Sequence, residues 1–204
     1  MIRRRGTLFV VSAPSGAGKT TLCRDVRRRV PNLAYSVSVT TRAPRPGEMD
    51  GTDFHFVAAP RFREMLDRGE FAEWATVHGN LYGTRARTLE DALNDGRDVL
   101  LDVDTQGAAQ LRARYPEAVL VFITAPSMAE LEQRLRERGA DGDTEIERRL
   151  RRAREEIALW REYQYLIVNR DLKEAVEQLE AIVLAERCRT ARLSLMLNDL
   201  EVPN

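Results

Sequence analysis

The sequence has no long apolar run and no excess of charge of either sign. None of its hydrophobic stretches approaches the roughly 20 residues that span a membrane, and the apolar residues 8–11 after the basic N-terminus stop at Ser12, too early for a secretory signal. The 32 basic and 32 acidic side chains balance, which argues against a general nucleic-acid-binding surface. We therefore expect neither export nor membrane insertion, and no nucleic-acid partner.

Cysteine and lysine are both scarce. The two cysteines, Cys23 and Cys188, lie far apart and fit no metal-ligand spacing, which favours ordinary thiols in a reducing, cytoplasmic setting. Of 32 basic residues only Lys19 and Lys173 are lysines, and the other 30 are arginines. A chain that otherwise uses arginine keeps a lysine at position 19, which indicates a place for a compact point charge rather than a planar fork.

Short apolar segments alternate with amphipathic ones along most of the 204 residues. Buried strands are predicted at residues 7–12, 98–103, 118–123 and 165–168, and helices at about 19–29, 86–94, 106–114, 128–138 and 172–192. This alternation is typical of a three-layer α/β fold, with a parallel central sheet covered on both faces. The length and the 43% hydrophobic content suit one such domain with insertions.

Two regions break the alternation. Residues 34–84 are predicted to form strands at 35–39, 54–57 and 70–77 and a helix near 60–68, which indicates a small α+β insertion at the edge of the main sheet. Residues 126–162 are helical, dense in Arg and Glu, and broken at 139–143, as in a mobile lid. Most lid charges are expected to form ordinary ion pairs on solvated helices. The core would then comprise residues 1–33, 85–125 and 163–204.

The most specific chemical signal is a phosphate-binding loop at residues 13–20, between a predicted strand and a predicted helix. Gly16 and Gly18 let backbone N–H groups turn toward phosphate oxygens, and the start of the next helix carries partial positive charge. Lys19 would reach the β- and γ-phosphates, and Thr20 would offer a hydroxyl to Mg²⁺. The core is therefore predicted to be a P-loop NTPase fold that holds a nucleoside triphosphate.

Three further residues bear on this loop. Ala13 stands where the pattern asks for glycine, a change that is tolerable if its φ is negative. Asp102, at the end of a predicted strand, has the position of a carboxylate that orients Mg²⁺ directly or through water. Asp104 also suits a helix N-cap. A glycine-rich turn without a ligand is the alternative to a phosphate loop, and the strand–loop–helix context disfavours it.

With these residues in view, the sequence resembles the guanylate kinases of bacterial type over nearly its whole length. The resemblance depends on separated motifs in one order, at residues 12–20, 38–48, 70–74, 79–84, 101–107 and 134–150. It implies a P-loop nucleoside-monophosphate kinase that uses ATP and Mg²⁺ to phosphorylate GMP and dGMP in purine nucleotide metabolism. The implied partners are these small nucleotides, and a homo-oligomer stays open because nothing in the sequence reports oligomeric state.

The resemblance implies an acceptor site made by the insertion. Glu73 would accept hydrogen bonds from the N1–H and exocyclic amine of guanine, which adenine cannot supply. Arg42 and Arg45 would grip the GMP phosphate as forks, and Tyr82 would add a hydroxyl. For the two arginines, a solvated turn around the neighbouring prolines is the alternative. The implied GMP-binding residues are Ser38, Arg42, Arg45, Phe54, Glu73, Tyr82, Thr84 and Asp104.

Phe54 departs from the family pattern. Guanylate kinases commonly carry at this place a tyrosine whose hydroxyl meets the GMP phosphate, whereas Phe54 keeps the ring without the hydroxyl. His55 is not expected to replace that hydroxyl, because strand alternation turns it to the opposite face.

The donor site is implied in the same way. Its ATP-binding residues would be Ala13, Pro14, Ser15, Gly16, Ala17, Gly18, Lys19, Thr20, Thr21 and Asn169, and its metal ligands would be Thr20 and Asp102. Asn169 would lie beside adenine, although asparagine at a strand end is also a common turn former. The implied catalytic residues neutralise phosphate charge, since phosphoryl transfer needs positioning more than a base; they are Lys19, Arg134, Arg138 and Arg149. The other lid arginines match nothing specific and are expected to be surface charge; they are Arg136, Arg148, Arg151, Arg152 and Arg154.

Two other functions remain open from the sequence. A binding module that kept this fold and lost catalysis would lack the loop lysine or the phosphate arginines, yet Lys19, Arg42 and Arg45 are all present. A small P-loop kinase acting on a sugar phosphate would not need a base pocket around Glu73 and Ser38. Both alternatives are therefore weaker than a nucleotide kinase.

Overall fold

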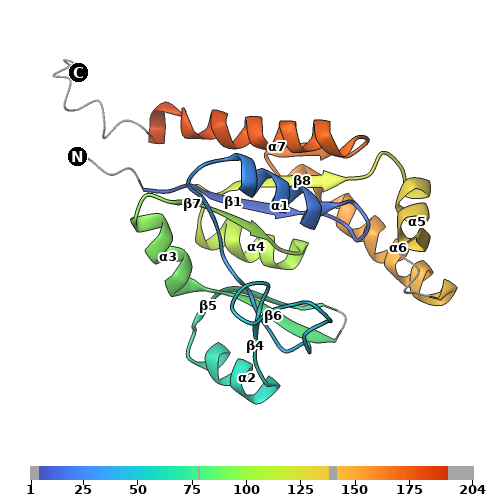
Figure 1. The fold of residues 1–204 in the computed structure, drawn as a ribbon, viewed down its shortest axis with the longest axis horizontal. Coiled ribbons are helices and arrows are strands. Elements are labelled where there is room, and N and C mark those ends of the chain that lie inside the picture. Colours follow the sequence, from blue (N-terminus) through green and yellow to red (C-terminus); the bar gives the residue numbers. More distant parts are fainter. Residues whose placement is uncertain (1–4, 78, 138–141, 193–204) are drawn as a thin grey trace.

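The central sheet is parallel and has five strands. A computed structural model describes residues 5–77, 79–137 and 142–192, and its larger sheet has the strand order β2-β7-β1-β8-β9 (Figure 1). These strands are β1 (Leu8–Ser12), β2 (Leu33–Tyr35), β7 (Asp98–Asp102), β8 (Val119–Thr124) and β9 (Tyr165–Val168). Because the strands are parallel, all their carboxyl ends lie along one edge, and the phosphate loop leaves that edge after β1.

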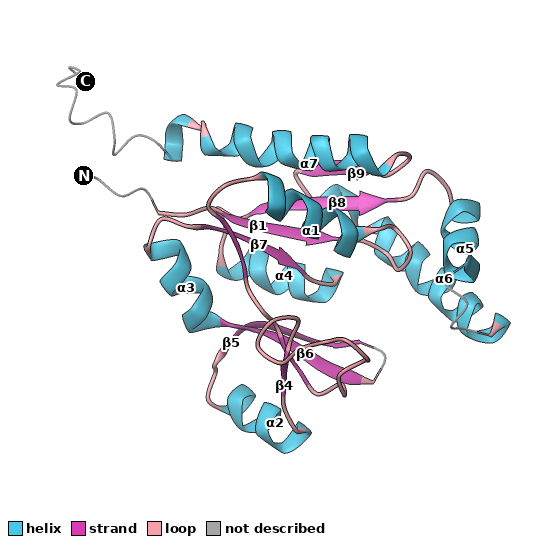
Figure 2. Cartoon of the chain, in the orientation of Figure 1, coloured by secondary structure: helices cyan, strands magenta, loops and turns pink. Residues whose placement is uncertain are grey.

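Helices cover both faces of this sheet (Figure 2). On one face lie α1 (Lys19–Arg29) and α7 (Leu172–Arg187), and on the other α3 (Ala86–Asn94) and α4 (Thr105–Arg114). Along β1, Phe9 and Val11 belong to the core cluster under α1 and α7, while Leu8 and Val10 belong to the cluster under α3 and α4. Successive strand side chains point to opposite faces, so a strand covered twice is apolar throughout. The predicted three-layer α/β fold is confirmed.

A second, smaller sheet lies beside the core, with the strand order β4-β3-β6-β5 (Figure 1). It consists of β3 (Val39–Thr40), β4 (His55–Phe56), β5 (Phe71–Val77) and β6 (Asn80–Arg85), and it carries α2 (Ala59–Asp67). Phe62 of α2 stacks on Phe71 at 4.5 Å between ring centroids. Trp74 and Gln110 exchange two hydrogen bonds, of 3.1 and 2.7 Å, which tie β5 to α4 of the core.

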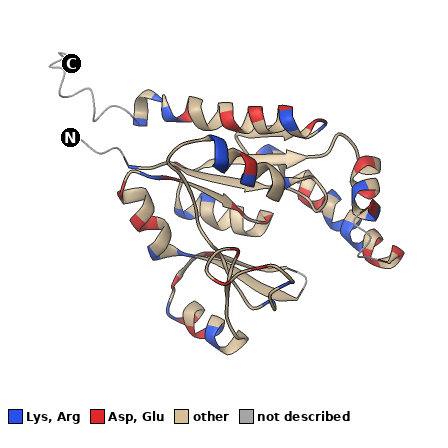
Figure 3. Cartoon of the chain, in the orientation of Figure 1, with Lys and Arg blue, Asp and Glu red and all other residues tan. Residues whose placement is uncertain are grey.

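The segment between β8 and β9 is helical and highly charged. It contains α5 (Met128–Glu137), α6 (Asp143–Ala158) and the short 3-10 helix η1 (Trp160–Glu162), and Figure 3 shows both signs of charge along α5 and α6. Arg136 pairs with Glu132 at 2.9 Å and with Asp143 at 2.6 Å, as solvated helices were expected to do. Among the described residues, every helix is too short or too polar to span a bilayer.

Three elements differ from the prediction. The strand expected at 35–39 is divided, because Leu33–Tyr35 joins the central sheet beside β7 whereas Val39–Thr40 joins the small sheet. An extended pattern does not report which sheet a strand joins. The strand β6 was not predicted, and α7 ends at Arg187 instead of residue 192, where the Cys188 amide bonds back to the Ala185 carbonyl. The residue boundaries of the core, insertion and lid stay a prediction.

Candidate nucleotide site

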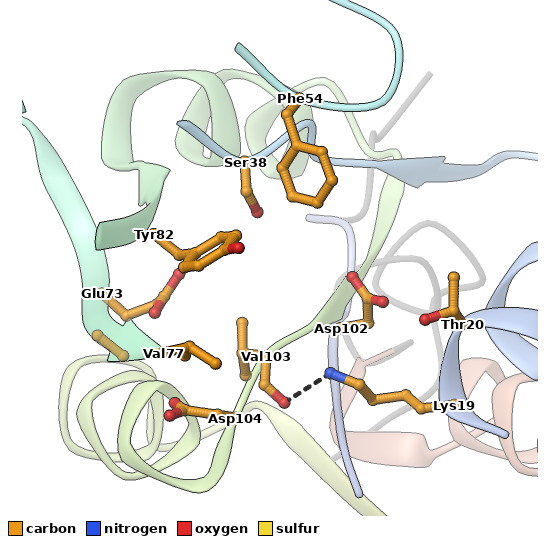
Figure 4. A pocket seen from close by; sticks show the side chains of 11 residues that line it. Lys19, Thr20, Ser38, Phe54, Glu73, Val77, Tyr82, Asp102, Val103 and Asp104 are labelled. Atoms are coloured by element: carbon orange, nitrogen blue, oxygen red, sulfur yellow. Dashed lines mark hydrogen bonds between the residues drawn. The ribbon is translucent and has the colours of Figure 1, made fainter. Parts of the chain in front are cut away.

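A cavity of about 240 Å³ lies where the core meets the small sheet (Figure 4). The core contributes residues predicted for the donor site, and the insertion contributes residues predicted for the acceptor site. In Figure 4, Glu73, Tyr82, Ser38 and Phe54 face the same space as Lys19 and Asp102. The lining residues are Lys19, Thr20, Ser38, Phe54, Glu73, Ala75, Val77, Tyr82, Asp102, Val103 and Asp104.

The phosphate loop has the backbone that its glycines allow. Gly16 and Gly18 both have a φ of +91°, a region that side chains of L-residues disfavour. Among the described non-glycine residues only Asn32 has a positive φ, so Ala13 meets the condition under which alanine replaces glycine there. The Lys19 ammonium donates to the Val103 carbonyl at 2.9 Å, and its side chain faces the cavity (Figure 4).

Asn169 braces this loop from the end of β9. Its buried side-chain amide donates to the Ala17 carbonyl at 2.8 Å, and a Cβ on Gly18 would lie only 2.5 Å from that nitrogen. Arg134 of α5 donates to the Asn169 carbonyl at 3.0 Å. Asn169 is therefore a structural clamp on the loop, and the sequence signal for that contact was only an asparagine after a strand. Its place beside adenine stays a prediction.

The two predicted metal ligands, Thr20 and Asp102, both face the cavity. Asp102 accepts a hydrogen bond from the Tyr35 hydroxyl at 2.8 Å, and Thr20 lies across from it at the start of α1 (Figure 4). In the described part of the chain, no group of three or more His, Cys, Asp or Glu could hold a metal by itself. Mg²⁺ prefers few protein carboxylates together with phosphates and water, so Thr20 and Asp102 fit it. Sequence reasoning missed Tyr35, which orients Asp102.

The predicted guanine-binding carboxylate is buried. Glu73 is 4% exposed, and it accepts a hydrogen bond of 2.6 Å from Thr84, which lies behind it instead of lining the cavity. Burial raises the pKa of Glu73 to about 7, with a smaller rise from the charge of Asp104, while the Thr84 hydroxyl opposes the change. A Cβ on Gly107 would lie 2.4 Å from a Glu73 carboxylate oxygen, so a larger residue at this position would have to displace that carboxylate.

Asp104 has two functions in the structure. It caps α4, because its Oδ1 accepts from the Gly107 amide at 2.9 Å, which confirms the capping alternative, and it also lines the cavity. Its Oδ2 accepts from Gln106 and from Arg152, each at 3.1 Å. The expectation that Arg152 is surface charge is therefore wrong: its side chain is 33% exposed and pairs with Asp104 and with Glu156.

Arg42 is held by a carboxylate. Its side chain is 14% exposed and makes a two-pronged ion pair with Glu48, both bonds at 2.9 Å, while its Nε donates to the Tyr82 hydroxyl at 3.2 Å. This pairing lowers the pKa of Glu48. The solvated-turn alternative does not describe Arg42. Glu48 is the functional neighbour that sequence reasoning missed, although it ends the motif at 38–48.

Of the other predicted phosphate contacts, Phe54 lines the cavity and Arg45 does not. The Phe54 ring lines the cavity 5.3 Å from the Arg42 guanidinium carbon and 5.9 Å from the Tyr82 ring, so these three side chains converge. Arg45 is exposed and does not line the cavity, and its backbone amide donates to Glu48 at 2.7 Å. The turn alternative fits Arg45.

Two of the predicted catalytic arginines, Arg134 and Arg149, lie near the phosphate loop. Arg149 of α6 lines a second cavity of about 190 Å³ together with Lys19, Ser15 and Arg152. Arg134 contacts the clamp residue Asn169, as described above. The predicted catalytic residue Arg138 lies outside the described residues.

Comparison with known proteins agrees with this two-sided site. The family model for guanylate kinase matches residues 5–186, which contain every motif named above. The chain is 52% identical over 192 residues to the guanylate kinase of Geobacter metallireducens, covering 94% of this chain and 95% of that protein. The chain belongs to the guanylate kinase family. It is also 53% identical over 192 residues to the guanylate kinase of Syntrophotalea carbinolica, covering 94% and 91% of the two chains.

Solved structures agree with the family assignment. The crystal structure of guanylate kinase from Anaplasma phagocytophilum matches with a TM-score of 0.81 at 34% identity, over 100% of both chains. The crystal structure of TT1252 from Thermus thermophilus, with a TM-score of 0.52 at 15% identity over 90% of this chain and 98% of that one, shares the fold alone. A member of the guanylate kinase family is a nucleoside-monophosphate kinase, and a cavity lined from two sides suits two substrates that must meet.

Proposed function

We propose that the chain transfers the γ-phosphoryl group of ATP to GMP, and less efficiently to dGMP, as a Mg²⁺-dependent cytoplasmic enzyme of purine nucleotide metabolism. The observation that carries the proposal is one cavity with the loop lysine Lys19 on one side and the buried carboxylate of Glu73 on the other. Binding of a triphosphate needs the loop lysine, and recognition of a guanine base needs the buried carboxylate.

On the donor side, backbone N–H groups of residues 13–20 and the start of α1 bind the triphosphate. Lys19 has three N–H donors and uses one on Val103, so two are left for phosphate oxygens. Arg134, Arg138 and Arg149 add positive charge from the lid, and Asn169 lies next to adenine. Thr20 and Asp102 would hold Mg²⁺, which supplies neutralisation of phosphate charge when bound.

On the acceptor side, ionised Glu73 accepts the N1–H and amino donors of guanine. Ser38 and Asp104 complete the pocket, and Thr84 supports the Glu73 carboxylate from behind. Adenine has no such donor pair, so the same carboxylate would stay buried with only the hydrogen bond from Thr84. The missing bonds cost enough free energy to discriminate against adenine. Hydrogen bonds to the charged form favour it, so GMP binding lowers the pKa of Glu73 from its nucleotide-free value of about 7.

The phosphate of GMP meets Arg42 and the Tyr82 hydroxyl, with Arg45 joining from the exposed turn. Arg42 is pre-oriented by Glu48, and its bonds to Glu48, Ala43 and Tyr82 together use four of its five N–H donors. Phosphoryl transfer then depends on alignment and charge neutralisation, and no side chain has to act as a strong base.

A nucleotide screen tests the proposal. With ATP and Mg²⁺, turnover of GMP should exceed that of dGMP, and AMP and phosphosugars should react little. AMP turnover comparable to that of GMP would contradict the base pocket. Preferred turnover of a phosphosugar would indicate a different kinase class, and GMP binding without turnover would support a binding module.

A further inference from the structure

We propose that Arg152 is a positioning residue for the acceptor site, which holds Asp104 from the lid helix α6 and so joins the lid to the base pocket. The proposal rests on the proposed function, because it assigns a role to Asp104 in binding GMP. The sequence around Arg152 assigns this side chain no role.

The contact joins two elements that are distant in the chain. Arg152 lies within α6, and its Nη2 donates to the Asp104 Oδ2 at 3.1 Å across 48 residues of sequence. Its Nε donates to Glu156 at 2.9 Å, and Glu156 is itself buried. Two carboxylates bound to different nitrogens of one planar guanidinium, Asp104 at Nη2 and Glu156 at Nε, fix the orientation of the group. Arg152 is therefore locked between the lid and the start of α4.

The bond leaves Asp104 free to meet a ligand. An ionised carboxylate has about four acceptor positions, and here Gly107 uses one on Oδ1 while Gln106 and Arg152 use two on Oδ2. The remaining position is on Oδ1 of a residue that lines the cavity. Arg152 thus orients the Asp104 carboxylate and leaves one of its acceptor positions for a ligand.

The charge of Arg152 also matters to its surroundings. The cavity brings Asp104 near Glu73, and the charge of Asp104 contributes to the raised pKa of Glu73. A cation paired with Asp104 offsets this repulsion, so that both carboxylates can face one guanine base. Loss of Arg152 should therefore weaken GMP binding more than it slows transfer.

The competing role for Arg152 is a direct contact with the donor. It lines the second cavity with Lys19 and Arg149, on the loop side. That role would raise the KM for ATP, whereas positioning of Asp104 raises the KM for GMP. The two roles therefore give different kinetic results.

The test compares Arg152→Gln with Arg151→Gln, its exposed neighbour on the same helix, which removes the same charge. Arg152→Gln should raise the KM for GMP about threefold to tenfold, as expected for one partly exposed charge-assisted hydrogen bond. The KM for ATP and kcat should stay within about twofold, and Arg151→Gln should match the wild type. Arg152→Lys, which keeps the charge, should fall between wild type and Arg152→Gln.

A double-mutant cycle identifies the partner. In an Asp104→Asn background, Arg152→Gln should add little further change in the KM for GMP, because the shared interaction is already lost. Additive effects of the two substitutions on the KM for GMP would overturn the proposal. A rise confined to the KM for ATP would also overturn it, as would equal KM values for Arg152→Gln and Arg151→Gln. So would an Arg152→Lys variant with a KM for GMP as high as that of Arg152→Gln. If the wild type itself does not phosphorylate GMP, the proposed function fails instead.

Discussion

The two sides of the cavity are built by different means. The loop side depends on backbone conformation, with two glycines at φ +91° and a lysine that touches a main-chain carbonyl. The insertion side depends on side chains, with Glu73 buried against Thr84 and Arg42 held by Glu48. Backbone N–H groups bind any phosphate chain, whereas a buried carboxylate distinguishes one base from another. We therefore expect the turnover rate to depend on the loop side and base selectivity to depend on the insertion side.

Removing the loop lysine should give the largest effect and separate the two sides. Lys19→Ala should lower turnover about a thousandfold, since in the proposed function the substitution removes charge beside the transferring phosphoryl group. Calorimetry should find GMP affinity unchanged within about twofold. Loss of GMP affinity together with turnover would show that the two sides are not independent.

Altering the buried carboxylate should affect selectivity. Glu73→Gln places an amide N–H where guanine also donates, so the KM for GMP should rise about tenfold to a hundredfold while the KM for ATP changes little. Steady-state kinetics with each substrate varied in turn measures both. An unchanged KM for GMP would remove Glu73 from the acceptor site.

The same substitution should stabilise the nucleotide-free chain at high pH. Burial raises the pKa of Glu73 from 4.5 to about 7, so between these values the folded chain binds more protons than the unfolded chain, and its stability falls as pH rises. Glutamine does not titrate. Glu73→Gln should therefore be more stable than wild type above pH 7 by about 1–3 kcal/mol, and the difference should shrink toward pH 5. Urea unfolding measures it, and a difference independent of pH would contradict the buried-carboxylate explanation.

The smallest predicted effect restores a hydroxyl on the insertion side. Phe54→Tyr should lower the KM for GMP several-fold to about tenfold with little change in kcat, because a hydrogen bond to a charged phosphate acts on ground and transition states alike. Phe56 lies 5.8 Å from the Arg42 guanidinium carbon but does not line the cavity, so Phe56→Tyr is the matched control. A raised or unchanged KM for Phe54→Tyr would mean that the hydroxyl does not reach the phosphate.

Features that carry their own local pattern could be predicted from the sequence. The four strands of the predicted core and the loop at 13–20 follow from apolar run length and glycine placement. The remaining features depend on contacts between residues that are distant in the sequence. Arg152, for example, has the same local sequence pattern as Arg151 and Arg154, and it differs from them only because α6 approaches α4 at this position. Likewise, nothing near Leu33–Tyr35 states that its partner is β7, about 65 residues later.

The clamp between Asn169 and Ala17 bears on how the protein acquires its activity during synthesis. The bond spans 152 residues, so the loop near the start of the chain gains its brace only after β9 has joined the sheet edge beside β8. Chains emerge from the N-terminus first, and contacts between distant residues form late because they must close long loops. A partly synthesised chain therefore has the phosphate-loop sequence without its finished shape, and ATP-binding competence should arise late in folding.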